Sequence, residues 1–210
     1  MSAIATAEAG SHSVAHALPP DEYFGSATPG KIGMWIFLLS DAFSFGGLLL
    51  AYGILRGGSQ VWRHPGEPAL GIPFTAFLTF LLICSSVTMV LAVAAATEGN
   101  RKQTMLFLAL TALGGAGFLT GQFHEYFGLV PHHGLVHEGL IFGHSAYAST
   151  FYVITSFHGA HVFTGTVYIL VTLARTAAGK TNANDVEILG LFWHFVDLIW
   201  ILVFTFVYLL

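Results

Sequence analysis

The chain has 210 residues, of which 55% are hydrophobic and only 9% are charged. Soluble globular domains are about one-quarter charged, so the composition predicts an integral membrane protein rather than a soluble one. The formal net charge of −4 is small, and it gives no indication of a nucleic-acid partner.

Taken in chain order, the sequence begins with a polar stretch and continues with long apolar segments. Residues 1–30 are small and polar, with Pro19-Pro20 and Pro29-Gly30, and are expected to form an N-terminal tail that is mobile or lies on the membrane surface. The apolar segments that follow cover residues 31–55, 72–96, 104–130, 147–174 and 187–210.

Each segment reaches the ~20 residues that a helix needs to cross ~30 Å of hydrocarbon. Backbone exposed to lipid must satisfy its own hydrogen bonds, so the segments are expected to be helical. The predicted fold is all-α, a polytopic membrane bundle of five transmembrane helices forming one domain over residues 31–210.

The loop charges predict the orientation of this bundle. Five crossings put five Lys or Arg residues on the side of the N-terminus: Lys31, Arg101, Lys102, Arg175 and Lys180. The other side carries only Arg56 and Arg63. Since cytoplasmic loops carry the excess of positive charge, the N-terminus is predicted inside and the C-terminus outside.

Six ionisable residues lie inside the apolar segments. They are the carboxylates Asp41, Glu125 and Asp197 and the histidines His158, His161 and His194. Ionisable residues within a membrane are rare, and they normally face protein or water. We therefore take these six as candidates for a buried polar network that serves proton uptake or lipid binding.

Several interpretations of the individual residues remain open. His158 and His161 could pack helices together, serve a proton or lipid headgroup, or ligate a metal or haem, which would need further ligands from other helices. Asp41 lies ~15 Å into its helix, which favours a functional role over a structural one. Glu125 is nearer a helix end and could reach the interface, and Asp197 could pair with His194 or a neighbouring helix.

Small residues in the third segment predict a close helix contact. Gly114, Gly117 and Gly121 recur at helical spacing, and glycines four residues apart allow two membrane helices to approach closely. We expect this face to pack inside the bundle.

The loop "VPHHGLVHEGLIFGH" clusters His132, His133, His137, Glu138 and His144. A zinc site is conceivable, but there is no cysteine and no closed four-ligand pattern, so an exposed interfacial loop is favoured. The sequence also lacks a P-loop, a dinucleotide-binding glycine motif, a haem-attachment motif and a nucleophile elbow. We predict no catalytic residue, metal site or redox cofactor in this chain.

Five motifs resemble subunit III of the haem-copper terminal oxidases. "WHFVDLIW" (residues 193–200) resembles the signature of that family's last helix, and "FHGAHV" (157–162) and "YAST" (147–150) resemble the helix before it. "QFHEY" (122–126) and "WIFLLSDAFSFGGLLLAY" (35–52) also match, and the order and spacing agree over residues 31–210.

The resemblance implies a short five-helix form of an accessory subunit without a metal of its own, in a bacterial-type plasma membrane. Such subunits pack beside catalytic subunit I, which with subunit II holds haem and copper. They join other respiratory subunits, bind phospholipid, and support proton uptake and durability of a proton-pumping enzyme. Asp41 takes the place of the family's buried carboxylate, and the other five ionisable residues fall on its polar network.

Two departures leave alternatives open. The common long form has seven helices, and Asp41 stands where the cytochrome c branch usually has glutamate, while aspartate is familiar from quinol-oxidising relatives. The electron donor is therefore left open. An accessory subunit of a nitric oxide reductase and a stand-alone proton or ion transporter are the alternative functions.

Overall fold

A computed structural model describes residues 28–128 and 134–210 of the chain. Its elements are α1 (Pro29–Gly58), α2 (Ile72–Thr97), α3 (Arg101–Phe127), α4 (Ala146–Ala177), α5 (Ala183–Val203) and the π-helical turn η1 (Phe204–Leu209). Five helices are long and apolar enough to cross a membrane, and the described ranges contain no strand. The all-α bundle of five transmembrane helices is therefore confirmed, whereas the orientation of its termini stays a prediction.

Capping residues explain where the helices begin. The side chain of Thr28 accepts the backbone N–H of Lys31, so α1 begins at Pro29, two residues before the expected start. Asp185 accepts the N–H of Asn182 at 3.4 Å, and α5 likewise begins four residues early, at Ala183 rather than residue 187. Polar caps of this kind satisfy N–H groups that have no acceptor within the helix.

The third helix begins and ends three residues earlier than expected. α3 ends at Phe127, and Gly128 follows it with φ of 69°, a conformation that glycine adopts without strain. The expected end at residue 130, together with His132 and His133, lies outside the described part of the chain. The same holds for residues 1–27 of the expected tail.

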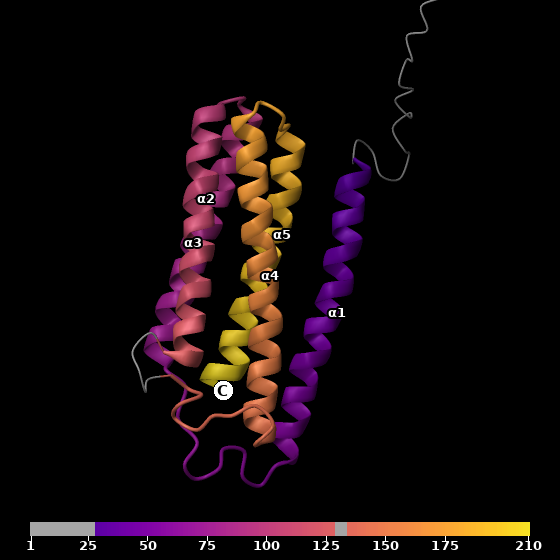
Figure 1. Ribbon diagram of the computed structural model, residues 1–210. Helices are drawn as coiled ribbons and strands as arrows, with labels where there is room; N and C mark the ends of the chain where they lie inside the picture. Colours follow the sequence, from indigo (N-terminus) through magenta and orange to yellow (C-terminus); the bar gives the residue numbers. More distant parts are fainter. Residues whose placement is uncertain (1–27, 129–133) are drawn as a thin grey trace, which may run out of the picture.

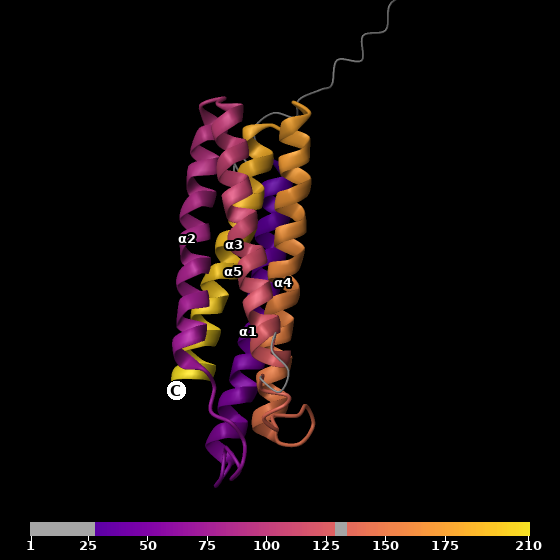
Figure 2. The same cartoon turned by 60° about the vertical axis from the view of Figure 1, so that its left-hand side comes forward.

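Consecutive helices run antiparallel, and α2 to α5 form a compact group with α1 on its outside (Figures 1 and 2). The turns α2–α3 and α4–α5 lie at one end of the bundle, and the longer connections α1–α2 and α3–α4 lie at the other end (Figure 1). Half of the α5 span is buried within the chain, compared with 17% of the α1 span. α5 is thus the central helix and α1 the peripheral one.

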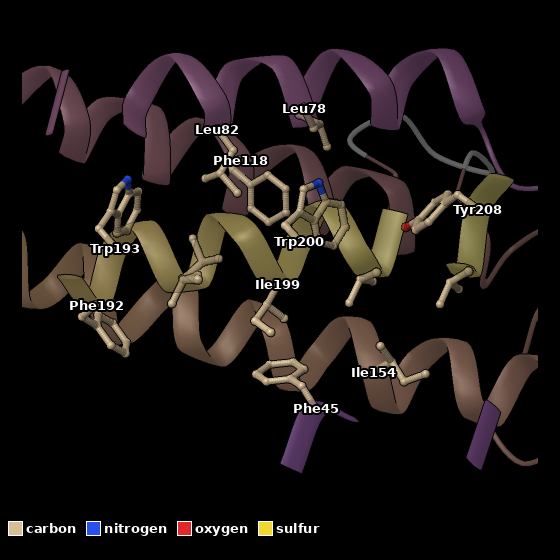
Figure 3. Packing of buried hydrophobic residues seen from close by; sticks show 14 of the residues in the cluster. Phe45, Leu78, Leu82, Phe118, Ile154, Phe192, Trp193, Ile199, Trp200 and Tyr208 are labelled. Carbon is tan, nitrogen blue, oxygen red and sulfur yellow. The ribbon is translucent and has the colours of Figure 1, made fainter. Parts of the chain in front are cut away.

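Two tryptophans anchor α5 in the centre of the bundle (Figure 3). The indole N–H of Trp193 donates to Oγ of Ser85 at 3.1 Å, and that of Trp200 donates to Oγ1 of Thr79 at 2.9 Å. Lipid tails are as apolar as leucine, so membrane helices associate through close packing and hydrogen bonds rather than through the hydrophobic effect. These two bonds fix the rotation of α5 against α2.

Small residues bring α2 and α3 close together. A Cβ added to Gly114 would lie 2.5 Å from Cβ of Ser85, and one added to Gly117 would lie 3.0 Å from Cδ2 of Leu81. At Gly121 the added atom would meet the side chain of Leu78. All three glycines of the predicted contact face therefore lie on the α2 side of α3.

We expect Gly114→Ala to destabilise the chain by about 1–3 kcal/mol, because the new methyl group overpacks the contact with Ser85. Gly46→Ala is the matched control, since nothing lies within 4 Å of a Cβ at this glycine of α1. Alanine is the better helix former, so the control should be neutral or slightly stabilising. Thermal unfolding of both variants in detergent checks this, and equal midpoints would contradict the packing.

Candidate functional site

A carboxylate and a histidine meet where α1 crosses α4. α1 turns Leu38, Asp41 and Phe45 toward the bundle, and only 7% of Asp41 is exposed. Oδ1 of Asp41 lies 3.3 Å from Nε2 of His161. The other ring nitrogen of His161, Nδ1, lies 2.8 Å from the carbonyl oxygen of Phe157. The structure thus joins two of the six predicted residues directly.

The geometry determines how many protons this pair holds. A carbonyl oxygen only accepts hydrogen bonds, so Nδ1 of His161 must carry a hydrogen. One further proton between Nε2 and Asp41 would lie either on the imidazole or on the carboxyl group. Both arrangements leave the pair without net charge, which suits a site surrounded by hydrocarbon. The geometry therefore allows the two side chains to share one proton.

A groove of about 430 Å³ runs beside this pair, between α1, α4 and α5. Its lining residues are mainly apolar: Met34, Phe37, Ala160, His161, Thr164, Tyr168 and Phe192. Lys31 lies one turn before Met34 and forms an ion pair with Glu187 of α5 at 2.7 Å. The groove therefore combines an apolar wall, a proton-holding pair and a charged group near one end.

His158, one turn before His161, has different surroundings. Its ring is fully buried, 4.7 Å from the ring of Trp200 and tilted by 31°, and edge-on to Phe118 at 5.7 Å. Neither ring nitrogen has a hydrogen-bond partner among the described residues. His158 is thus enclosed by aromatic rings and is separate from the pair of Asp41 and His161.

Glu125 forms a second polar cluster near the end of α3. Thr75 of α2 donates to Oε1 at 2.9 Å, and Tyr208 of η1 donates to Oε2 at 3.0 Å. Glu125 was predicted from the sequence, whereas its partners Thr75 and Tyr208 were not. A threonine in an apolar run and a tyrosine near the chain end carry no local signal, because both contacts depend on the tertiary fold.

The last two predicted residues meet α2. Nδ1 of His194 lies 2.7 Å from Oγ of Ser86, and the carboxyl group of Asp197 also lies against Ser86. Oδ1 of Asp197 has no partner within the described ranges. The sequence left open a direct pairing of Asp197 with His194. In the structure, both side chains contact Ser86 instead. The six residues form separate groups rather than one continuous network.

Among the described residues, no group of three or more His, Cys, Asp or Glu side chains is placed to hold a metal ion. His137 and His144 lie in the connection between α3 and α4, and Glu138 lies beside them. The absence of a metal or haem in this chain stays a prediction.

Residues 25–210 match the family described as cytochrome c oxidase subunit III. The chain is 35% identical over 184 residues to cytochrome c oxidase subunit 3 of Corynebacterium diphtheriae, covering 85% of this chain and 86% of the relative. It is 32% identical over 209 residues to cytochrome bo(3) ubiquinol oxidase subunit 3 of Pseudomonas aeruginosa, covering 96% and 94%. The chain belongs to the cytochrome c oxidase subunit III family.

Family membership confirms the resemblance seen in the motifs. The chain is an accessory subunit of a haem-copper terminal oxidase and a multi-pass integral protein of the bacterial plasma membrane. These matches favour the oxidase over a nitric oxide reductase or a stand-alone transporter. The oxidase subunit of Alkalihalophilus pseudofirmus, 34% identical over 182 residues, agrees with this assignment; the match covers 85% of this chain and 85% of that relative.

The Glu125 cluster generates a stability prediction. Tyr208→Phe removes the donor to Oε2 and leaves a buried carboxyl oxygen unpaired, so we expect a loss of about 1–3 kcal/mol. Tyr168→Phe is the control, because Tyr168 lines the groove and its hydroxyl makes no hydrogen bond to the described residues. Thermal unfolding of the two variants compares them, and equal midpoints would show that the bond to Glu125 contributes nothing.

Proposed function

We propose that this subunit supports proton uptake by the catalytic subunit of a proton-pumping oxidase, and that the pair of Asp41 and His161 serves this role. The observation that carries the proposal is the geometry of the pair, which holds one exchangeable proton without net charge. Its position beside an open groove supports the same role, since a proton carrier needs access to exchange partners. The motif resemblance also implies that Asp41 takes the place of the family's buried carboxylate.

The groove beside the pair is proposed to hold a phospholipid. Its wall is apolar, with Met34, Phe37 and Phe192 among the lining residues, and suits an acyl chain. Lys31 lies in the first turn of α1, near one end of the groove. Its ammonium group is therefore at the level expected for the headgroup of a bound phospholipid. Lipid bound here would also fill the space between α1 and the rest of the bundle.

The subunit is proposed to bind no haem or copper itself. His158 is enclosed by rings, and both nitrogens of His161 already face protein oxygens. We place the haem and copper in catalytic subunit I and subunit II, beside other respiratory subunits. Relatives named for cytochrome c and for ubiquinol match this chain at similar identity, so we assign the choice of electron donor to the partner subunits.

Asp41→Asn tests the proposed role in the assembled oxidase. The asparagine amide can still donate to Nε2 of His161, so the fold and the haem content should be retained while the exchangeable proton is lost. Initial oxygen reduction should stay near the wild-type rate, because the redox centres lie in other subunits. Proton uptake, or resistance to inactivation during turnover, should fall several-fold, as measured by oxygen consumption with a pH indicator.

Asp197→Asn is the matched control, a buried carboxyl group away from the groove, and should behave as wild type. Complete loss of initial activity in an assembled Asp41→Asn complex would contradict an accessory role. If that variant takes up protons and resists inactivation during turnover as the wild type does, Asp41 serves helix packing alone.

A further inference from the structure

A small polar pocket lies at the end of the bundle where the α2–α3 and α4–α5 turns meet, at the top of Figure 1. Its volume is about 220 Å³. It is lined by Ala96, Gly99, Arg101, Thr104, Thr176, Gly179, Thr181, Asn182, Ala183 and Val186. None of these residues belongs to the groove or to the groups of ionisable residues described above.

Arg101 supplies the positive charge of this pocket. One of its N–H groups donates to the carbonyl oxygen of Ala177 at the end of α4, and the guanidinium lies against Gly179, with Nη1 3.6 Å from where a Cβ would be. A guanidinium carries five N–H donors, so most of them remain available for a ligand after this contact.

Thr181 supplies a hydroxyl group that the protein itself does not use. Its Oγ1 is buried and has no hydrogen-bond partner among the described residues. Two other lining hydroxyls are satisfied within their own helices, since Thr104 donates to Asn100 at 3.0 Å and Thr176 donates to Thr172 at 2.8 Å. A buried hydroxyl without a partner is costly, so Thr181, which lines the pocket, favours a ligand that brings a hydrogen-bond acceptor.

The start of α5 also borders the pocket, through Asn182 and Ala183. The first N–H groups of a helix attract anions, and because the capping box uses those of Asn182 and Asp185, Ala183 is the lining residue that offers its N–H here. The acidic residues nearby are already paired, Asp185 with Arg175 at 3.4 Å and Glu187 with Lys31 at 2.7 Å. The donors that converge on this pocket therefore favour an anion with several acceptor oxygens.

We propose that this pocket binds a phosphate group. A guanidinium fork, a free hydroxyl and a helix N-terminus match the oxygens of a phosphate. The pocket lies at the ends of transmembrane helices, the level of lipid headgroups. The phosphate can come from a phospholipid headgroup or from free inorganic phosphate. The site is separate from the groove proposed to hold an acyl chain.

Thr181→Val and Arg101→Lys test the site in the purified oxidase complex. Thr181→Val breaks no hydrogen bond within the protein, so assembly should be unaffected, and Arg101→Lys keeps the charge while removing the planar fork. Thr97→Val is the control, because Thr97 lies at the same end of the bundle, is exposed and donates to Val93.

Two arms distinguish the sources of phosphate. Native mass spectrometry counts the phosphatidylglycerol retained by complexes taken from nanodiscs that contain this lipid, and phosphorus NMR measures binding of inorganic phosphate to the delipidated complex. We expect the wild type and Thr97→Val to bind phosphatidylglycerol, inorganic phosphate or both. Thr181→Val and Arg101→Lys should bind the same probe roughly tenfold more weakly. Binding in the first arm identifies a lipid headgroup, and binding in the second identifies free phosphate. Equal binding by all four proteins, or no binding in either arm, would overturn the proposal and leave a water-filled pocket.

Discussion

The structure depends on one constraint, which is that polar groups inside the hydrocarbon have no water to bind and must find partners within the protein. The two indole bonds of α5 illustrate the consequence. Trp193 and Trp200 each place a large apolar ring in the centre of the bundle and a single N–H on a hydroxyl of α2. Because those hydroxyls have defined positions, the bonds set the rotation of α5, and with it the direction in which His194 and Asp197 face.

The same constraint explains how α1 is attached. This helix is the least buried of the five, and its apolar contacts with α4 and α5 are correspondingly limited. Polar contacts hold it at three levels, through Lys31 to Glu187, through Asp41 to His161, and through Arg56 to the carbonyl oxygen of Leu210. The proton-holding pair is the middle one of these contacts. Asp41 and His161 therefore join α1 to α4 inside the membrane span, beside the groove.

Much of the fold could be predicted from the sequence, because the length and hydropathy of a membrane span are local properties. The five helices and the ionisable residues within them follow from such local patterns. The partners of Glu125 do not, since Thr75 is 50 residues away along the chain and Tyr208 is 83 residues away. The π-helical turn that carries Tyr208 also has no signal in the periodicity.

His158 and His161 show the same limit within one helix. Both were candidates for one polar network because they are ionisable residues in an apolar segment. In the structure, His161 contacts Asp41, whereas His158, three residues earlier on the same helix, packs among aromatic rings. The donors of the polar pocket were also missed, because Arg101 begins α3 and Thr181 lies in the α4–α5 turn, and only the packed bundle brings them together. Contacts between helices, unlike the helices themselves, depend on the orientation of every neighbour.

The most direct test of the account is to purify the chain from its native membrane under mild conditions and to identify what remains bound. We predict that it copurifies with the haem-containing and copper-containing subunits of an oxidase, and that the complex reduces oxygen. Copurification with nitric oxide reductase subunits, or isolation as a homo-oligomer without haem, would contradict it.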